Sequence, residues 1–100
     1  MYARMMTARI DRAKLDDAAR AWRTLVLPDH RRRRGFRQAS LVADRTSGMV
    51  VITTYWDSQA DSEAETRDPA RAALTAQVRM FFVTPATVRG YEVLVDGAAS

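Results

Sequence analysis

The sequence predicts an α+β fold with the element order β-α-β-β-α-β, the split βαβ arrangement called ferredoxin-like, around a four-stranded antiparallel sheet. Residues 49–56 are β-branched and aromatic almost throughout, as is typical of a strand. Residues 14–26 and 69–81 carry apolar side chains at helical spacing. The length of 100 residues fits one domain, which we expect to span residues 1–96 and to end in a disordered tail at 97–100.

The first part of the chain is predicted to form a strand and a helix. Tyr2–Ile10 has apolar residues on both sides, which is typical of a strand. Asp11 is a helix-capping residue, and the amphipathic helix follows from Lys14. Pro28 is expected to interrupt this helix and to move Leu27 out of the α region.

The remaining segments complete the order. Residues 36–44 and 49–56 are separated by a glycine-containing turn, which predicts a hairpin. Ser58 can cap a polar helix, and Asp68–Pro69 is expected to break that helix and start the next one. The last strand is predicted over residues 88–95.

Strand 49–56 is apolar on both faces, which favours a covered sheet. Its odd positions include Met49, Val51 and Tyr55, and its even positions include Val50, Ile52 and Trp56. A sheet with helices on one face needs only one apolar side. The simplest cover for the other side is the sheet of a second copy, so we expect a homodimer that closes a two-fold α/β barrel, with Tyr55 in the interface.

Composition excludes several classes of site. The chain has no cysteine and a single histidine, so neither a disulfide nor a cysteine or multi-histidine metal site is expected, and we predict no metal. No apolar run approaches the roughly 20 residues of a membrane span, and the N-terminal residues lack the apolar core of a signal peptide. We therefore expect a cytoplasmic protein without membrane contacts.

The net charge of +4 is the balance between sixteen basic residues, all arginines except Lys14, and twelve acidic residues. Arg31–Arg34 form the only basic run, which is either an anion-binding edge or a solvated helix end. The solvated end is favoured because no aromatic residues interleave with the arginines for base stacking. No nucleic-acid partner is expected.

Gly35–Phe36 at the start of the second strand, the turn at Asp44–Gly48 and the run Tyr55-Trp56-Asp57-Ser58 together carry a family resemblance. On these features the chain resembles the antibiotic-biosynthesis-monooxygenase superfamily over about residues 2–96. The resemblance implies a dimeric ferredoxin-like α/β barrel. Enzymes of this superfamily either oxidise phenolic polyketides with dioxygen and no cofactor, or degrade haem. Both kinds place the substrate between sheet and helices, against the motif tryptophan, which is Trp56 here.

The chain departs from both groups of enzymes. Leu74 stands about where haem-degrading members have their iron-binding histidine, and Thr7 where they have an asparagine, so haem degradation is not expected. Against the quinone-forming members, Ile52, Ser62 and Thr75 replace an asparagine, a tyrosine and an arginine. Of these functional positions, Trp56 alone is shared.

The candidate catalytic residues are Trp56, as a wall of the pocket, and His30, as a base. The alternative for Trp56 is an apolar core residue whose indole N–H finds an acceptor, and that for His30 is a solvated surface histidine. The neighbouring arginines are expected to favour neutral His30 by charge repulsion. Candidate substrate-binding residues are Thr7, Ile52, Thr54, Leu74 and Arg71.

Two functions follow from these candidates. The first is a cofactor-independent monooxygenase of a small aromatic or polyketide-like substrate. The alternative is a non-catalytic dimeric α/β barrel, of the stress-response type, that binds a small hydrophobic or acidic ligand between its sheet and helices.

Overall fold

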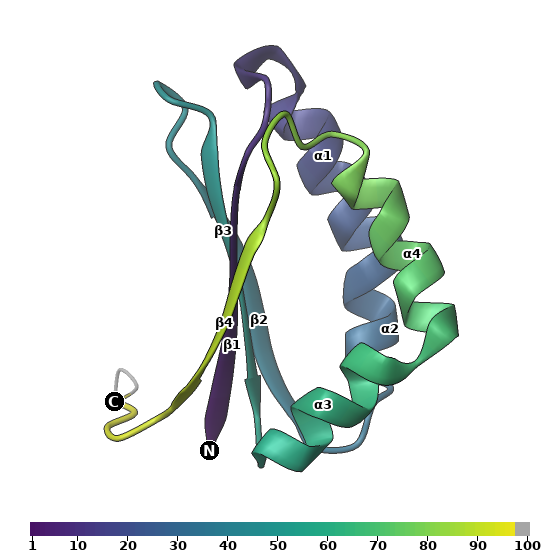
Figure 1. The fold of residues 1–100 in the computed structure, drawn as a ribbon, viewed down its shortest axis with the longest axis vertical. Coiled ribbons are helices and arrows are strands. Elements are labelled where there is room, and N and C mark those ends of the chain that lie inside the picture. Colours follow the sequence, from purple (N-terminus) through teal and green to yellow (C-terminus); the bar gives the residue numbers. More distant parts are fainter. Residues whose placement is uncertain (98–100) are drawn as a thin grey trace.

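The computed structural model describes residues 1–97 and confirms the predicted α+β order (Figure 1). The elements are β1 (Tyr2–Arg9), the 3-10 turn η1 (Arg12–Lys14), α1 (Leu15–Ala21), the π-helical turn η2 (Trp22–Val26), α2 (Leu27–Arg31), β2 (Phe36–Ala43), β3 (Met49–Trp56), α3 (Gln59–Arg67), α4 (Pro69–Arg79) and β4 (Thr87–Glu92). The four strands pair antiparallel in the order β2-β3-β1-β4, and the helices cover one face of the sheet (Figure 1). Among residues 1–97, no helix has the length and apolar character needed to cross a bilayer.

The register places alternate residues of β3 on the two faces of the sheet. Ile52 pairs with Met6 of β1, and both belong to the core cluster that packs against the helices with Trp22, Val26 and Val78. Even positions of β3 therefore point to the helix side, as predicted. A second cluster, formed by Ala8, Ile10, Leu15, Ala18 and Val50, extends the core along the same face.

Among the described residues 1–97, no helix lies on the opposite face of the sheet (Figure 1). Tyr55 pairs with Ala3, whose other neighbour is Tyr91 of β4, so these residues lie side by side on that face. Val51 pairs with Val42 in the same way. Tyr91 and Val42 are exposed in the single chain. The helix-free face is thus partly apolar and uncovered, which is the property that led to the dimer prediction.

The prediction that Pro28 interrupts the first helix is wrong. Leu27 has φ −59° and ψ −42°, inside the α region, and the helical path continues from α1 through η2 into α2. In η2 the Leu27 N–H donates to the Trp22 carbonyl, five residues back. A proline ring in a regular helix clashes with the carbonyl four residues earlier, and a wide π-turn just before the ring offers the chain a way around this clash.

The two helix starts in the second half follow the sequence closely. The Ser58 hydroxyl accepts from the Asp61 N–H at 3.2 Å, and the Asp68 carboxylate accepts from the Ala70 N–H at 2.9 Å with Pro69 at the first helical position. Two ends differ from prediction, since α4 ends at Arg79 and β4 at Glu92, which leaves residues 93–95 outside the strand. Of the predicted tail at 97–100, residues 98–100 lie outside the described residues.

Candidate functional site

Trp56 ends β3 and is fully buried under the helices, with 0% of its surface exposed. Its indole N–H donates to the Thr54 hydroxyl at 2.9 Å. Thr54 precedes it by two positions and lies on the same face of the strand, as strand alternation predicts. The indole donor is satisfied within the protein, and the ring is left to act as an apolar wall.

His30 is buried against Trp56, with 1% of its surface exposed. Its ring stacks on Phe36 at 5.6 Å between centroids and meets the edge of Trp56 at 6.0 Å. The alternative that His30 is a solvated surface residue is therefore wrong. The physical reason is the continuous helix through Pro28, which turns His30 toward the sheet.

A carboxylate and a guanidinium complete the environment of His30. Glu65 of α3 places Oε1 at 3.3 Å from His30 Nδ1, and the same oxygen contacts Nε of Arg71 from α4. Glu65 and Arg71 are 2% and 6% exposed. We call His30, Glu65 and Arg71 the buried cluster. Glu65 was missed by the sequence analysis, because nothing in the polar α3 segment marks one of its carboxylates as buried.

The hydrogen bonding of the buried cluster is incomplete. Among residues 1–97, His30 Nδ1, both Glu65 carboxylate oxygens and Arg71 Nε lack a partner with hydrogen-bond geometry, although the charged groups are in contact. Buried polar groups without partners are uncommon in folded proteins and call for an explanation. Glu65 is thus held against His30 and Arg71 by charge contacts and not by well-oriented hydrogen bonds.

Burial controls the protonation of the buried cluster. Desolvation, followed by the positive charge of Arg71, lowers the pKa of His30 to about 4, while Asp29 opposes the shift. The lowered pKa agrees with the prediction that His30 is neutral. Its main cause is burial, however, and among Arg31–Arg34 the main charge effects include that of Arg33 alone. Burial also raises the pKa of Glu65 above its ordinary value, against the opposing effect of Arg71 and Arg4.

A small enclosed cavity of about 20 Å³ lies beside His30. Its walls include Ile52, Thr54 and Arg71, three of the predicted substrate-binding residues, and also Arg4 of β1. The volume suits a single water molecule, so any aromatic ligand requires the walls to move.

Three predicted site residues do not border this cavity. Trp56 contacts His30 and Thr54, which line the cavity, but does not line it itself. Thr7 pairs with Val51 on the opposite face of the sheet, because its odd position in β1 alternates away from Met6. The prediction that Thr7 lines the site is wrong for this chain. Leu74 is partly buried and packs against the core cluster of Met6, Trp22, Val26, Ile52 and Val78 rather than reaching the cavity.

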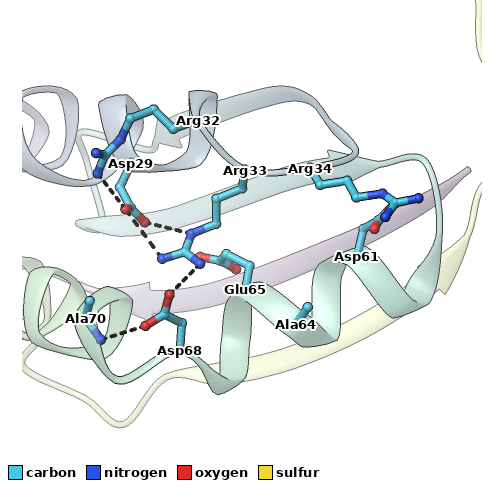
Figure 2. A pocket seen from close by; sticks show the side chains of 9 residues that line it. All are labelled: Asp29, Arg32, Arg33, Arg34, Asp61, Ala64, Glu65, Asp68 and Ala70. Atoms are coloured by element: carbon cyan, nitrogen blue, oxygen red, sulfur yellow. Dashed lines mark hydrogen bonds and ion pairs between the residues drawn. The ribbon is translucent and has the colours of Figure 1, made fainter.

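An open groove of about 610 Å³ lies on the outer side of the buried cluster (Figure 2). Arg33 spans it, donating to Asp29 at 3.0 Å and to Asp68 at 2.8 Å, and Glu65 lines the same groove. The other arginines of the basic run are exposed, as a solvated helix end predicts. The Arg33 ion pairs tie α2 to the start of α4 above the buried cluster.

Acidification below pH 7 should lower the unfolding free energy of the protein through protonation of His30. The unfolded side chain has a pKa near 6.5 and the folded one a pKa of about 4, so the unfolded state binds more protons between these values. The unfolding free energy should therefore fall on acidification, by about 2 kcal/mol at pH 5 for this group alone. Urea titrations between pH 7 and pH 5 would measure the slope.

The His30→Phe variant should flatten this pH dependence, because it retains an aromatic ring and removes the titrating group. Arg4, Arg33, Asp29, Glu65 and Arg71 are the charged groups around His30. Glu65 acts in the opposite direction because its pKa is raised, and Glu65→Gln separates the two effects. An equal slope in His30→Phe and the unmodified chain would contradict the assignment.

The described geometry is that of a ferredoxin-like α+β chain whose third strand ends in a tryptophan beneath the helices. Solved structures of named monooxygenases share this fold. The monooxygenase from the gene ActVA-Orf6 of Streptomyces coelicolor, in complex with the ligand nanaomycin D, is 18% identical with a TM-score of 0.84, over 99% of this chain and 92% of that one.

Two further solved structures share the fold of this chain. One is an antibiotic biosynthesis monooxygenase that is 17% identical, with a TM-score of 0.75 over 95% of this chain and 100% of that one. The other is Rv0793 from Mycobacterium tuberculosis, 16% identical with a TM-score of 0.75 over 97% and 98%. No protein-family model and no curated protein matches the sequence. The chain therefore has the fold of the antibiotic biosynthesis monooxygenases. At identities of 16–18%, this similarity establishes the fold and not the activity.

Proposed function

We propose that the chain is a cofactor-independent monooxygenase that oxidises a small aromatic or polyketide-like phenol or enol with dioxygen. The observation that carries the proposal is His30, a neutral imidazole buried against Trp56 at the edge of a cavity that also contains Arg71 and Arg4. Such a site combines a proton acceptor, cations for a developing anion and an apolar wall.

The proposed reaction needs no group beyond the two substrates. His30 accepts the hydroxyl proton, and Arg71 stabilises the resulting anion. The anion passes one electron to dioxygen, and the substrate radical and superoxide join at the ring carbon that is CH₂ in the keto form and CH in the enolate. The imidazolium returns its proton to give a hydroperoxide, and the remaining hydrogen of this carbon leaves as a proton in the next step. Cleavage of the O–O bond leaves a carbonyl on this carbon and releases the second oxygen as water, so that CH₂ and O₂ become C=O and H₂O.

The buried cluster supports the same roles. Glu65 lies 3.3 Å from His30 Nδ1, where a carboxylate can orient the imidazole and stabilise the imidazolium that forms. Trp56 lies outside the cavity lining and would hold the His30 ring in place by edge contact, since its own N–H is already used by Thr54. The likeness in fold to a monooxygenase solved with nanaomycin D is consistent with this substrate class.

The alternative is a non-catalytic barrel that binds a small hydrophobic or acidic ligand. It is favoured by the small size of the cavity, about 20 Å³. It is also favoured by Ile52, Ser62 and Thr75, which stand where quinone-forming enzymes of the resembled superfamily carry an asparagine, a tyrosine and an arginine. This function needs the same opening of the cavity but no proton transfer.

Oxygen consumption with anthrone separates the two functions. The enzyme should consume dioxygen above the uncatalysed background, and His30→Gln should lower the rate at least about 100-fold, as expected for loss of a general base. Arg31→Gln, an exposed change on the same helix, should retain the full rate. No uptake over a panel of phenols, together with thermal stabilisation by them, would instead support the binder.

We also propose a homodimer formed through the helix-free face of the sheet. Tyr55→Asp places a charge on an inner strand of that face and should give monomers or aggregate in sedimentation velocity, because an unpaired charge is costly in an apolar interface. Trp56→Ala, on the opposite face, should remain dimeric. An intact dimer of Tyr55→Asp would place the interface elsewhere.

A further inference from the structure

The interior around His30 holds more positive than negative charge. Arg4 and Arg71 both border the enclosed cavity, whereas Glu65 is the one carboxylate in contact with them or with His30 among residues 1–97. Neutral His30 adds no charge. An uncompensated cation in a partly dry interior is unfavourable, and an anion that binds beside it offsets this cost.

Arg4 is the cation without a partner. Within the described chain no carboxylate lies within 4.0 Å of its guanidinium, whereas Arg71 contacts Glu65. The side chain is partly buried, and its pKa is lowered by this burial and by the neighbouring Arg71. Arg4 therefore has its hydrogen-bond donors available to a ligand.

Arg4 also stands between two spaces. On one side is the enclosed cavity with His30, and on the other is an open pocket of about 380 Å³ bounded by α3 and β4. Arg67 and Arg89 line this outer pocket, and Arg67 is already paired with Glu63 at 3.1 Å. Tyr2 supplies an aromatic wall, since its hydroxyl fills the space above Gly90, where a Cβ would come within 1.7 Å of it.

We propose that the ligand of this site is a hydroxylated aromatic carboxylate, whose carboxylate pairs with Arg4 in the outer pocket and whose hydroxyl points inward to His30. The planar guanidinium suits a carboxylate because it can donate two parallel hydrogen bonds. The proposal names the substrate class of the proposed function and rests on the same cavity, but it does not require turnover.

Calorimetric titration at pH 7 with two probes tests the proposal. 1-Hydroxy-2-naphthoate and 1-naphthol differ by the carboxylate alone. We expect the unmodified chain to bind the naphthoate at least about tenfold more tightly, the gain typical of one charge-assisted contact. Arg4→Met should abolish this preference and leave binding of 1-naphthol within about threefold, which also shows that the variant is folded.

Two controls sharpen the test. Arg4→Lys keeps the charge without the planar fork and should retain part of the preference. Arg23→Met removes an exposed arginine away from both spaces and should retain all of it. Equal binding of the two probes by the unmodified chain, or an undiminished preference in Arg4→Met, would overturn the proposal.

The outcome is independent of the test of catalysis. A carboxylate preference that depends on Arg4, without oxygen uptake, would support the ligand class and assign the chain to the binding alternative. Oxygen uptake with anthrone and no carboxylate preference would support the monooxygenase and overturn the ligand class.

Discussion

Trp56→Ala is expected to lower the unfolding free energy by about 3–5 kcal/mol, the range found when a buried aromatic residue is truncated. The side chain is 0% exposed and contacts the rings of His30 and Phe36. Its removal loses apolar burial, leaves a cavity and deprives the Thr54 hydroxyl of its donor. Urea unfolding at one fixed protein concentration is the appropriate measurement, because the proposed dimer would make the midpoint depend on concentration.

Leu25→Ala is the matched control for this substitution. Leu25 lies on the π-turn η2 with 38% of its surface exposed, so its truncation removes less buried surface and creates no closed cavity. We expect a loss of about 1 kcal/mol or less. A Trp56→Ala loss as small as that of Leu25→Ala would show that the indole does not hold the helices on the sheet.

The same substitution enlarges the space beside His30. A cavity of about 20 Å³ excludes aromatic rings. Removal of the indole, which contacts His30 without lining this cavity, opens a further space on the other side of His30 that is large enough for an aromatic ring. Trp56→Ala should therefore bind 1-naphthol more tightly than the unmodified chain in the same titration. Weaker binding would instead mean that the indole is itself the main contact of the ligand ring.

The parts of the fold that follow from the sequence are those with local causes. Met49–Trp56 forms a strand because its residues are β-branched and aromatic, and strand alternation then places Trp56, Thr54 and Ile52 on one face. Ser58 and Asp68 start α3 and α4 because their side chains accept backbone N–H groups at the helix ends. These predictions need no knowledge of the tertiary structure.

The burial of His30 was not predicted, because we expected Pro28 to interrupt the helix. The π-turn lets Trp22 and Val26 both reach the core and carries the helix past Pro28. With the helix continued, His30 falls four residues after Val26, on the buried side. The helical spacing of Val26 and His30 in the sequence therefore indicates a buried His30. The expected break at Pro28 opposed this interpretation, because the residue before a proline is usually found outside the α region.

Glu65 had no such signal. The buried cluster takes one residue from each of α2, α3 and α4, so its members meet only after three helices have packed on the sheet. The position of Thr7 was missed for a related reason, because the pairing of β1 with β3, and not the composition of β1, determines which of its residues face the helices.

Glu65→Leu should be among the most damaging substitutions in the chain, with an expected loss of about 3–5 kcal/mol of unfolding free energy. It removes the carboxylate that contacts Arg71 and leaves Arg71 and Arg4 as neighbouring cations around a neutral histidine. Arginine remains protonated in proteins, so the site has no means of removing the excess charge. Urea unfolding at pH 7 would measure the loss.

Arg71→Leu should cost less, and its cost should depend on pH. It leaves Glu65 buried without the guanidinium of Arg71 as a partner. A buried carboxylate can lose its charge by taking up a proton, and burial already raises the pKa of Glu65. Loss of Arg71 removes an effect that holds this pKa down, so the folded variant should bind a proton that the unfolded chain does not. The cost of Arg71→Leu should therefore be smaller at pH 5 than at pH 8.

The double variant Glu65→Leu, Arg71→Leu completes the cycle. It replaces the ion pair by apolar side chains and should be more stable than Glu65→Leu alone, because the buried cation that the single change exposes is gone. Additive losses, with equal and pH-independent costs for the two single variants, would mean that Glu65 and Arg71 act separately. The buried cluster could then not serve as the charge-balanced support of His30 on which the proposed proton transfer depends.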